Sequence, residues 1–363
     1  MATSRRRSLS RPTIALAGST LLAAVALTVS TAAPASAGKP GSGSSTGVGQ
    51  IFKVNPVQSS GIQTLTDQKD SDAAVPLSEY AQVQLRNLDG SGFLSGKWVT
   101  VKSSTGTPAF SASNTFVYTR HEDQFEQVMG YFWVNQSQEY LQSLGFGSTL
   151  PAVNMQQQVL RINQYGADNS FFNDARHFDI TLGKGGVDDA EDGEVIVHEY
   201  GHAVHNAQVP GFGSTLDAGS IGESFGDYLS VTVGLAAAKQ YGWPVKTDKA
   251  CVADWDSVSY TSTVPHCLRR VDTNLKVADR KGEVHFDGQI WSRALWDSRN
   301  AYIALGLGSE KWDTTLIDSQ FRYAPDTSFS AAAKATYETA FDRDGEDAAA
   351  AVKAAFEARG ITF

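Results

Sequence analysis

The segment that decides the fold is Val195-Ile196-Val197-His198-Glu199-Tyr200-Gly201-His202-Ala203-Val204. A step of four residues along an α-helix turns about 400°, so His198 and His202 lie one turn apart on the same face, where two imidazoles can reach one Zn²⁺. Glu199 lies beside them and can take a proton from a water that the metal activates. The opposite side of this helix is apolar and small enough to be buried: Ile196, Val197, Tyr200, Gly201 and Val204. The segment therefore predicts a helix that is anchored on one face and chemically active on the other.

A second motif follows at a defined distance. Gly222-Glu223-Ser224-Phe225-Gly226-Asp227 places Glu223 21 residues after His202. Gluzincins, the zinc peptidases whose third ligand is a glutamate, carry that residue on a following helix, and the spacing here agrees. HEYGH followed by GESFGD resembles the thermolysin and fungalysin peptidases, and the HEY form leans toward fungalysin. The resemblance implies Glu223 as the third zinc ligand and Asp227 as the carboxylate that accepts a hydrogen bond from His198 and fixes that ring.

Two further blocks extend the resemblance in the expected chain order. Val284–Trp291, VHFDGQIW, resembles the segment in which these peptidases hold a histidine over the substrate carbonyl, which implies His285 as a donor to the oxyanion. Asn169–Phe172, NSFF, resembles their edge strand, which pairs with substrate backbone and implies Asn169 as a substrate-binding residue. The implied fold is α+β: a two-lobed thermolysin-like zincin with a β-rich N-terminal lobe, a mainly helical C-terminal lobe and the zinc helix between them.

The sequence departs from the family pattern at two places. Between His205 and Glu223 it has no tyrosine, the residue type that commonly adds a second hydrogen bond to the oxyanion. The residue that orients the family's second histidine is open, with Asp279 and Glu283 as alternatives. His205 shares a helix face with the two ligand histidines, but a rise of about 10 Å from His198 is too large for both to bind one ion. We interpret His205 as a histidine favoured by the helix dipole.

Composition limits the class of protein. The 363 residues are 41% hydrophobic and 19% charged with a net charge of −9, the balance of a globular chain of about two domains. Four of the 30 basic residues and none of the 39 acidic ones lie in residues 1–37, so the net charge without them is −13. This balance argues against a nucleic-acid or anionic-membrane binder. The expected partners are protein or peptide substrates, and the sequence does not predict an oligomeric state.

The N-terminus has the pattern of an export signal. Four arginines precede an apolar run over residues 14–29, and Ala35-Ser36-Ala37 supplies the small residues at which signal peptidase cuts. We predict a signal peptide over 1–37, cleavage after Ala37, and a secreted extracellular protein that is free of the membrane. A flexible leader is expected over 38–50, because GKPGSGSSTGVG has too little apolar surface to order itself.

The rest of the chain divides into two regions. Over 51–118, short alternating runs between Gly, Ser, Asn and Pro clusters predict a β-rich N-terminal region, either a lasting lobe or a segment removed on activation. The catalytic domain is expected over 119–363, beginning with a helix between residues 122 and 144. Cys251 and Cys267 are expected to form one disulfide outside the cell.

An acidic run lies just before the zinc helix and consists of Asp188, Asp189, Glu191, Asp192 and Glu194. Negative charge at a helix N-terminus is one explanation for such a run. The alternative is calcium, which takes six to eight oxygens and would need further ligands that the sequence does not identify. One catalytic Zn²⁺ is therefore the expected cofactor, and Ca²⁺ is an alternative second ion.

These residues predict a secreted zinc endopeptidase. Zn²⁺ would be held by His198, His202 and Glu223, and Glu199 would act first as a base and then as an acid. Among enzymes, the alternative is an aminopeptidase, because proteins with related folds include aminopeptidases. A non-enzymatic alternative is a secreted module that binds zinc without turnover. The presence of Glu199 argues against this alternative.

Overall fold

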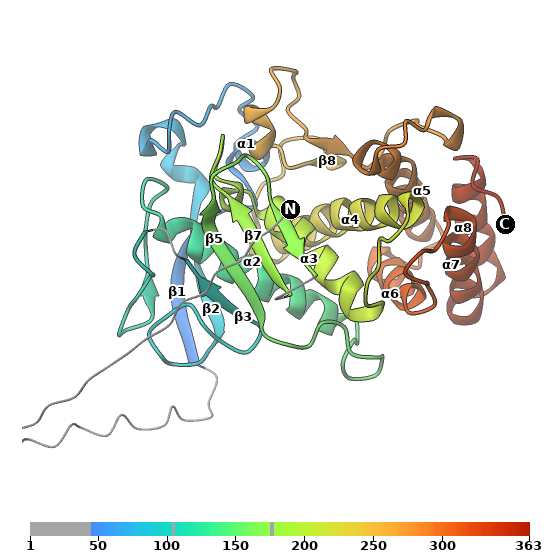
Figure 1. Cartoon of the computed structure of the whole chain (residues 1–363), viewed down its shortest axis with the longest axis horizontal. Coiled ribbons are helices and arrows are strands. Elements are labelled where there is room, and N and C mark those ends of the chain that lie inside the picture. Colours follow the sequence, from blue (N-terminus) through green and yellow to red (C-terminus); the bar gives the residue numbers. More distant parts are fainter. Residues whose placement is uncertain (1–44, 104–105, 175–177) are drawn as a thin grey trace, which may run out of the picture. The chain divides into compact units, whose positions relative to one another are not determined.

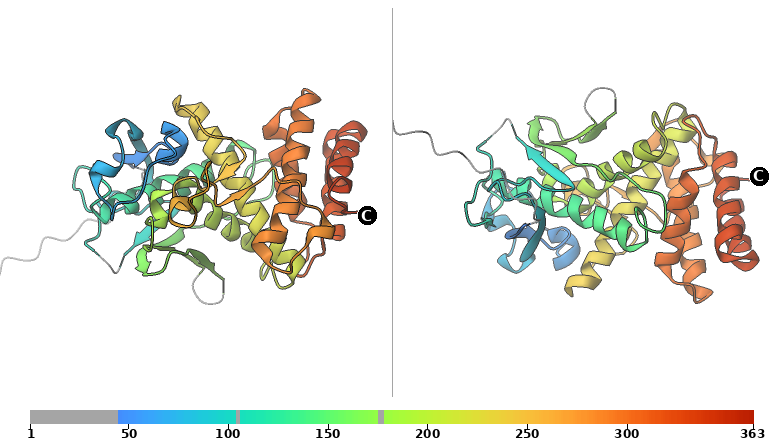
Figure 2. Two further views of the ribbon diagram at one scale, coloured as in Figure 1. Left: turned by 90° about the horizontal axis from the view of Figure 1, so that it is seen from above. Right: turned by 90° about the horizontal axis from the view of Figure 1, so that it is seen from below.

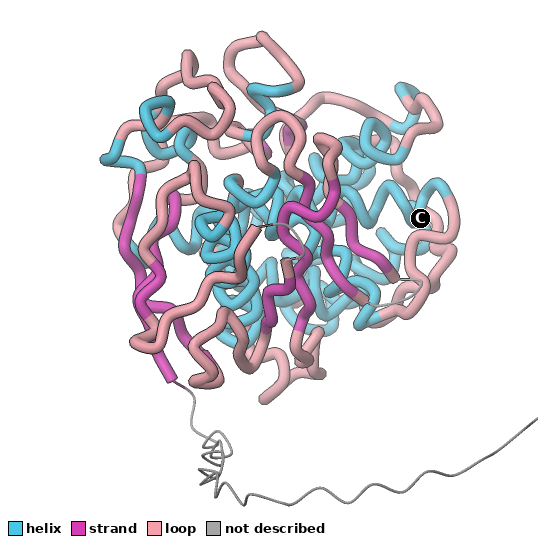
Figure 3. The backbone as a smooth tube through the Cα atoms, turned by 60° about the vertical axis from the view of Figure 1, so that its left-hand side comes forward, coloured by secondary structure: helices cyan, strands magenta, loops and turns pink. Residues whose placement is uncertain are grey.

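Two β-sheets form the strand-rich part of the chain. The computed structural model describes residues 45–103, 106–174 and 178–363. One sheet has the strand order β2-β1-β4 and the other β3-β5-β7-β6, and β8 pairs with β9. The strands are β1 (Ser45–Phe52), β2 (Tyr80–Leu88), β3 (Val99–Lys102), β4 (Thr115–Phe116), β5 (Gln158–Tyr165), β6 (Phe171–Asn173), β7 (Asp179–Gly183), β8 (Cys251–Val252) and β9 (Arg269–Arg270). Figure 3 shows the strands of the two larger sheets toward one side of the described chain, with helices behind them.

The pairing within the second sheet leaves β6 as an edge strand. β1 pairs antiparallel with β2 and parallel with β4. β3, β5 and β7 run parallel, and β6 closes the second sheet by antiparallel pairing with β7. β6 has one neighbouring strand among the described residues, so its other edge is open. The predicted edge-strand motif, Asn169–Phe172, leads into this strand.

Eight α-helices lie in the described part of the chain, six of them in its second half. They are α1 (Pro56–Ser60), α2 (Gln124–Ser143), α3 (Gly193–Gln208), α4 (Leu216–Tyr241), α5 (Val284–Ala304), α6 (Ser309–Gln320), α7 (Phe329–Asp344) and α8 (Glu346–Glu357). α3 and α4 lie between the sheets and the C-terminal helices in Figure 1, and α4 packs against both α3 and α5. In both views of Figure 2, α5 to α8 stack at the C-terminal end. The predicted α+β arrangement, strand-rich first and helical second, is confirmed.

The helix predicted between residues 122 and 144 is α2, and it is more deeply buried than one apolar stripe would require. α2 contacts both larger sheets as well as α3 and α4, so polar residues on its flanks are buried too. Several of these have hydrogen-bond partners; for example, Gln138 accepts a short hydrogen bond from the Tyr200 hydroxyl of α3. α2 therefore joins the sheets to the helix that carries HEYGH.

The expected leader over 38–50 is wrong in its second half, because residues 45–50 belong to β1. The glycines that suggested flexibility are needed for close packing. A Cβ on Gly49 would lie 2.7 Å from Val128 Cγ1 of α2 and 2.8 Å from Leu85 Cδ2 of β2. A Cβ on Gly47 would lie 2.4 Å from the carbonyl oxygen of Asn114. The glycines of β1 thus allow the strand to pack closely in the interior. Composition alone cannot distinguish such a buried strand from a flexible linker.

The expected boundary after residue 118 is also absent from the structure. The described residues from 45 onward form one compact unit, because β1 and β2 share their core with α2. The predicted signal peptide lies outside the residues that the structure describes. Within the described part of the chain, no helix has the length and apolarity needed to cross a membrane.

The packing of β1 can be tested by adding a single methyl group. We expect Gly49→Ala to lower the free energy of unfolding by about 1–3 kcal/mol, because its Cβ would overlap Val128 and Leu85. Gly166→Ala is the matched control, since a Cβ there meets no atom within 4 Å. Chemical denaturation of both variants measures the difference. Equal stability of the two variants would show that β1 is not packed as described.

Candidate active site

Helix α3 carries the HEYGH motif, as predicted. Asp192 caps its N-terminus by accepting a hydrogen bond from the Glu194 backbone N–H at 2.9 Å. The predicted apolar side is buried, and the larger residues on it are Ile196, Val197, Tyr200 and Val204. His198, Glu199 and His202, on the other side, line a cleft of about 530 Å³.

Two glycines bring α3 and α4 close enough for their side chains to share one site. A Cβ on Gly201 of α3 would lie 2.9 Å from the Gly226 Cα on α4. A Cβ on Gly226 would in turn lie 2.6 Å from Nδ1 of His198. Any larger residue at either position would push the helices apart, because a packed interior has no room to absorb such an overlap. The crossing turns Glu223 of α4 toward the two histidines of α3.

His198, His202 and Glu223 place three donor atoms around one point. The two Nε2 atoms are 3.2 Å apart, and the Glu223 carboxylate oxygens lie 3.3 Å from Nε2 of His198 and 3.5 Å from Nε2 of His202. Zinc ligands at about 2.0–2.2 Å in a tetrahedron are separated by about 3.3–3.5 Å. The spacing of these donors, two imidazole nitrogens and a carboxylate, thus fits one zinc ion with a fourth position open.

Asp227 and Arg269 fix the ring of His198 from behind. Asp227 Oδ1 lies 2.9 Å from His198 Nδ1, as the resemblance implied. Arg269 of β9 donates to both oxygens of Asp227, at 2.7 and 2.8 Å. Burial alone would raise the pKa of Asp227, but Arg269 and His198 outweigh it and lower this pKa to about 2. Asp227 therefore stays charged and holds His198 with Nε2 toward the metal position.

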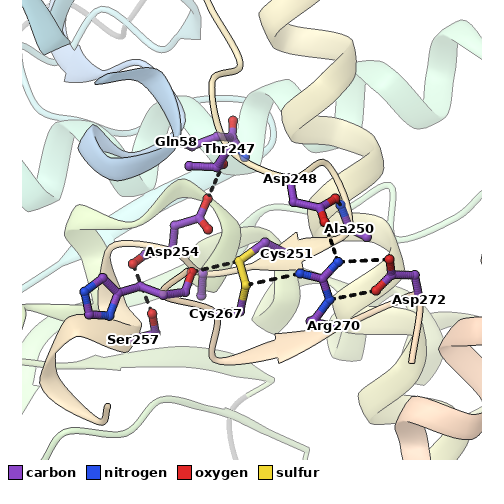
Figure 4. Close-up of a disulfide and its surroundings, with 12 residues drawn as sticks. Gln58, Thr247, Asp248, Ala250, Cys251, Asp254, Ser257, Cys267, Arg270 and Asp272 are labelled. Carbon is purple, nitrogen blue, oxygen red and sulfur yellow. Dashed lines mark hydrogen bonds and ion pairs between the residues drawn. A yellow bond between two sulfur atoms is a disulfide. The ribbon is translucent and has the colours of Figure 1, made fainter. Parts of the chain in front are cut away.

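Sequence reasoning missed Arg269, which lies 42 residues after Asp227 and has no motif of its own. The fold brings it into place through the β8-β9 ladder, and the disulfide closes that ladder. Cys251 of β8 is bonded to Cys267, just before β9, so the predicted disulfide is confirmed. Figure 4 shows this bond beside Arg270, which pairs with Asp248 and Asp272.

Glu199 lies beside the three donor atoms in the cleft. Its side chain is buried, and Oε2 has no hydrogen-bond partner among the described residues. Burial raises the pKa of Glu199 to about 7, His198 opposes the rise, and the negative charge of Glu223 adds to it. A carboxyl group that titrates near neutral pH can both accept and return a proton.

His285 reaches the same site from the first turn of α5. Its Nε2 lies 3.3 Å from a Glu223 oxygen, and its Nδ1 lies 2.6 Å from Glu283 Oε1. Glu283 also caps α5 by accepting from the backbone N–H groups of His285 and Phe286. Of the two alternatives for orienting this histidine, the structure therefore favours Glu283, since Asp279 caps a separate turn at Lys276.

The cleft wall opposite α4 includes Asn169 and the start of β6. Asn169, Ser170 and Phe171 line the cleft together with the predicted metal ligands. Tyr260 lines it as well, and its hydroxyl donates to the carbonyl oxygen of Asp168 at 2.5 Å. Tyr260 comes from a later loop, outside the interval between His205 and Glu223 that contains no tyrosine.

Two interpretations of charged residues need correction. His205 lies in the last turn of α3, as expected, but the helix dipole does not explain it: the residue is buried, its ring lies 4.4 Å from those of Phe212 and Phe225, and burial lowers its pKa well below the usual value. The acidic run is not simply charge at a helix N-terminus either. Glu191 pairs with buried Arg120, at 2.8 Å.

Comparisons with known proteins agree with this geometry. The model of the fungalysin metallopeptidase family (M36) matches residues 175–334, which include HEYGH, GESFGD and His285. Among 25 matching chains of solved structures is the precursor of protealysin, a metalloproteinase from Serratia proteamaculans. It is 18% identical, with a TM-score of 0.53 over 73% of this chain and 87% of that chain, a likeness that shows the fold. No curated protein matches this sequence.

The fold and the site together define a zinc metallopeptidase of the gluzincin type. The likeness to the fungalysin family covers residues 175–334, less than half of the chain, and the fold is thermolysin-like, so the fold and enzyme class predicted from HEYGH and GESFGD are confirmed. A peptidase of this family acts on proteins or peptides, which agrees with the predicted partners.

The Asp227–His198 contact predicts a loss of metal affinity on substitution. Asp227→Asn removes the charge that holds His198 and Arg269, so we expect zinc affinity to fall about 10–100-fold. Asp217→Asn is the matched control, because Asp217 is also on α4 and pairs with an arginine, Arg280, at 2.9 Å. Competition with a chromogenic chelator measures both affinities. Unchanged affinity in Asp227→Asn would contradict this role.

Proposed function

We propose that this chain is a secreted zinc endopeptidase in which His198, His202 and Glu223 hold the zinc ion. The observation that carries the proposal is the convergence of three donor atoms, 3.2–3.5 Å apart, beside buried Glu199, whose Oε2 has no hydrogen-bond partner in the part of the chain that the structure describes. All of these groups line one cleft of about 530 Å³.

Glu199 is the proposed proton carrier. A zinc ion at such a site supplies Lewis-acid activation of a water and of the substrate carbonyl. Oε2 of Glu199 takes the proton of the attacking water and later gives it to the leaving amine, so one carboxylate serves both steps. Its pKa of about 7 suits this double role near neutral pH.

His285 is the proposed donor to the oxyanion. Nδ1 of His285 lies 2.6 Å from Glu283 Oε1, so Nε2 is the ring nitrogen that remains for a hydrogen bond to the oxyanion. His285 stands close to Glu223 and so faces the same reacting group as the metal. On the other wall, Asn169 and the open edge of β6 are the proposed contacts for substrate backbone, by strand addition.

Secretion is supported by the export-signal pattern over 1–37 and by the Cys251–Cys267 disulfide. We also propose that residues 45–118 remain in the active enzyme. Asn55 and Gln58 of this region donate hydrogen bonds to Asp192 and Glu194 at 3.3 and 3.0 Å. Those two acids lie at the start of the zinc helix, so removal of the region would take one hydrogen-bond donor from each of these buried carboxylates.

The two alternative functions receive less support. An aminopeptidase needs a carboxylate that binds the substrate α-amine, and no residue of the cleft is identified for that task. A module that binds zinc without turnover would have no use for Glu199 and His285 in their positions beside the ligands.

Glu199→Gln tests the proposed chemistry. We expect this variant to keep one zinc per chain, because Glu199 is not a ligand, and to lose nearly all hydrolysis of an internally quenched peptide. Glu346→Gln, at the start of α8, is the control and should cleave at the wild-type rate. Full activity of Glu199→Gln would remove the proposed base. Wild-type enzyme that cleaved an N-terminal amino-acid amide but not the quenched peptide would establish the aminopeptidase instead.

The intact mass of the secreted, active form tests the fate of the N-terminal region. We expect a chain that begins after Ala37 and retains residues 45–118, because β1 and α1 contribute to the core. An active form that begins near residue 119 would contradict this expectation.

A further inference from the structure

A buried histidine forms part of the cleft wall beside the proposed zinc ligands. His205 follows His202 by three residues on α3, a step that keeps both side chains on one face of the helix and advances about 4.5 Å along its axis. The residue is only 2% exposed, yet it lines the same cleft as His202 and Glu223. A group that contacts His205 from the cleft therefore lies within one helical turn of His202.

The imidazole of His205 has no hydrogen-bond partner in the described part of the chain. Both of its ring nitrogens are buried and unpaired there. The ring packs against Phe212 and Phe225, whose side chains cannot form hydrogen bonds with it. Burial lowers the pKa of His205 well below the usual value, so the ring is neutral, with one N–H donor and one acceptor nitrogen. Because a phenylalanine would fill this position without leaving polar atoms unpaired, packing alone does not account for a histidine here.

The cleft next to His205 is bordered by residues with little or no side chain. A Cβ on Gly222 would lie 3.8 Å from both His202 Nδ1 and Phe212 Cε1 and would meet no closer atom. A Cβ on Gly213 would meet only the Cα of Gly219, at 3.9 Å. The absent side chains leave room beside His205 for part of a substrate. We call this part of the cleft the glycine recess, and its other lining residues are His202, Asn206, Phe212, Gly213, Gly219 and Gly222.

We propose that the glycine recess binds a substrate side chain with a hydroxyl or carboxamide group, and that His205 selects this side chain; the inference rests on the proposed peptidase function. Such a group both donates and accepts, so it can pair with either nitrogen of the neutral ring. A charged side chain would lose its hydration beside a ring without charge. An acidic one would also find no free cation, because Arg269, the only lysine or arginine among the described residues of the cleft, is held by Asp227.

The same contact discriminates against apolar side chains. In the free enzyme, water can pair with His205, and a hydroxyl or carboxamide that displaces this water reproduces its hydrogen bond. A valine or leucine side chain of the same shape would displace the water and leave the imidazole unpaired. Sites that are built to hydrogen-bond a substrate group reject the analogue without that group for this reason.

Matched peptide pairs test the proposal. Internally quenched peptides carry threonine or valine, or asparagine or leucine, at each position within three residues of the scissile bond. The members of a pair have nearly the same shape and compete in one mixture, so the ratio of their kcat/KM values does not depend on the amount of folded enzyme. His205→Phe removes both nitrogens and keeps an aromatic ring, and His205→Gln retains a donor and an acceptor. His266→Phe is the matched control, because His266 is also buried but borders a different pocket.

At one position we expect wild-type enzyme to prefer threonine over valine and asparagine over leucine by at least about tenfold. The preference should vanish in His205→Phe, persist in part in His205→Gln and remain unchanged in His266→Phe. His205→Phe should also melt no lower than wild type, because it removes two unpaired buried polar atoms. Three results would overturn the proposal: no preference at any position in wild type, the same preference in His205→Phe, or an equal loss in His266→Phe.

Binding to the zinc-loaded Glu199→Gln variant separates this proposal from the proposed function. The affinities of the uncut peptides, measured by calorimetry, should show the same preference and should lose it when His205→Phe is added. Equal affinities would overturn the glycine recess whether or not the wild-type enzyme cleaves the peptides. Wild-type protein that cleaves none of them would contradict the peptidase function, whereas cleavage without the preference would contradict the recess alone.

Discussion

The close crossing of α3 and α4 at Gly201 and Gly226 is the constraint on which the rest of the site depends. Zinc ligands must stand about 3.3–3.5 Å apart, and two of them come from one helix while the third comes from the other. Only helices whose backbones nearly touch can meet that requirement with a side chain as short as glutamate. A second close approach, of Gly288 on α5 to the Ser220 carbonyl of α4, sets His285 beside Glu223. Both contacts are possible because glycine, which has no Cβ, occupies these positions.

Around this crossing, charged side chains from distant segments form a series of contacts that leads outward from His198. Asp227 holds His198, Arg269 holds Asp227, and the disulfide at Cys251 and Cys267 closes the ladder that carries Arg269. Arg269 neutralises the charge of Asp227, so this buried carboxylate stays charged at low energetic cost. The proposed metal-binding face of α3 is consequently oriented by residues that share no motif with it.

The sequence predicted the parts of the site whose geometry is local. His198 and His202 are one helical turn apart wherever that helix lies, and Glu223 is recognised by its spacing within a known pattern. Arg269 could not be predicted, because its position depends on the path of the chain over the preceding 42 residues. The same holds for the burial of His205, because Phe212 and Phe225 contact its ring only in the folded chain. The leader was misjudged for a different reason: Gly47 and Gly49 have the composition of a linker, and their role appears only against Leu85 and Val128.

The buried acids before the zinc helix explain why the strand-rich half cannot be treated as a separate module. Glu191, Asp192 and Glu194 sit at the start of α3, and each takes partners from at least two other parts of the chain. Arg120 and Trp255 bind Glu191, Asn55 and the Trp255 backbone N–H bind Asp192, and Gln58 and the Ala253 backbone N–H bind Glu194. An unpaired carboxylate at this depth would cost more than most single contacts contribute. The first turn of α3 is therefore stable only when segments from the N-terminal region and from the loop after β8 have both reached it, which couples formation of the proposed metal site to folding of the whole unit.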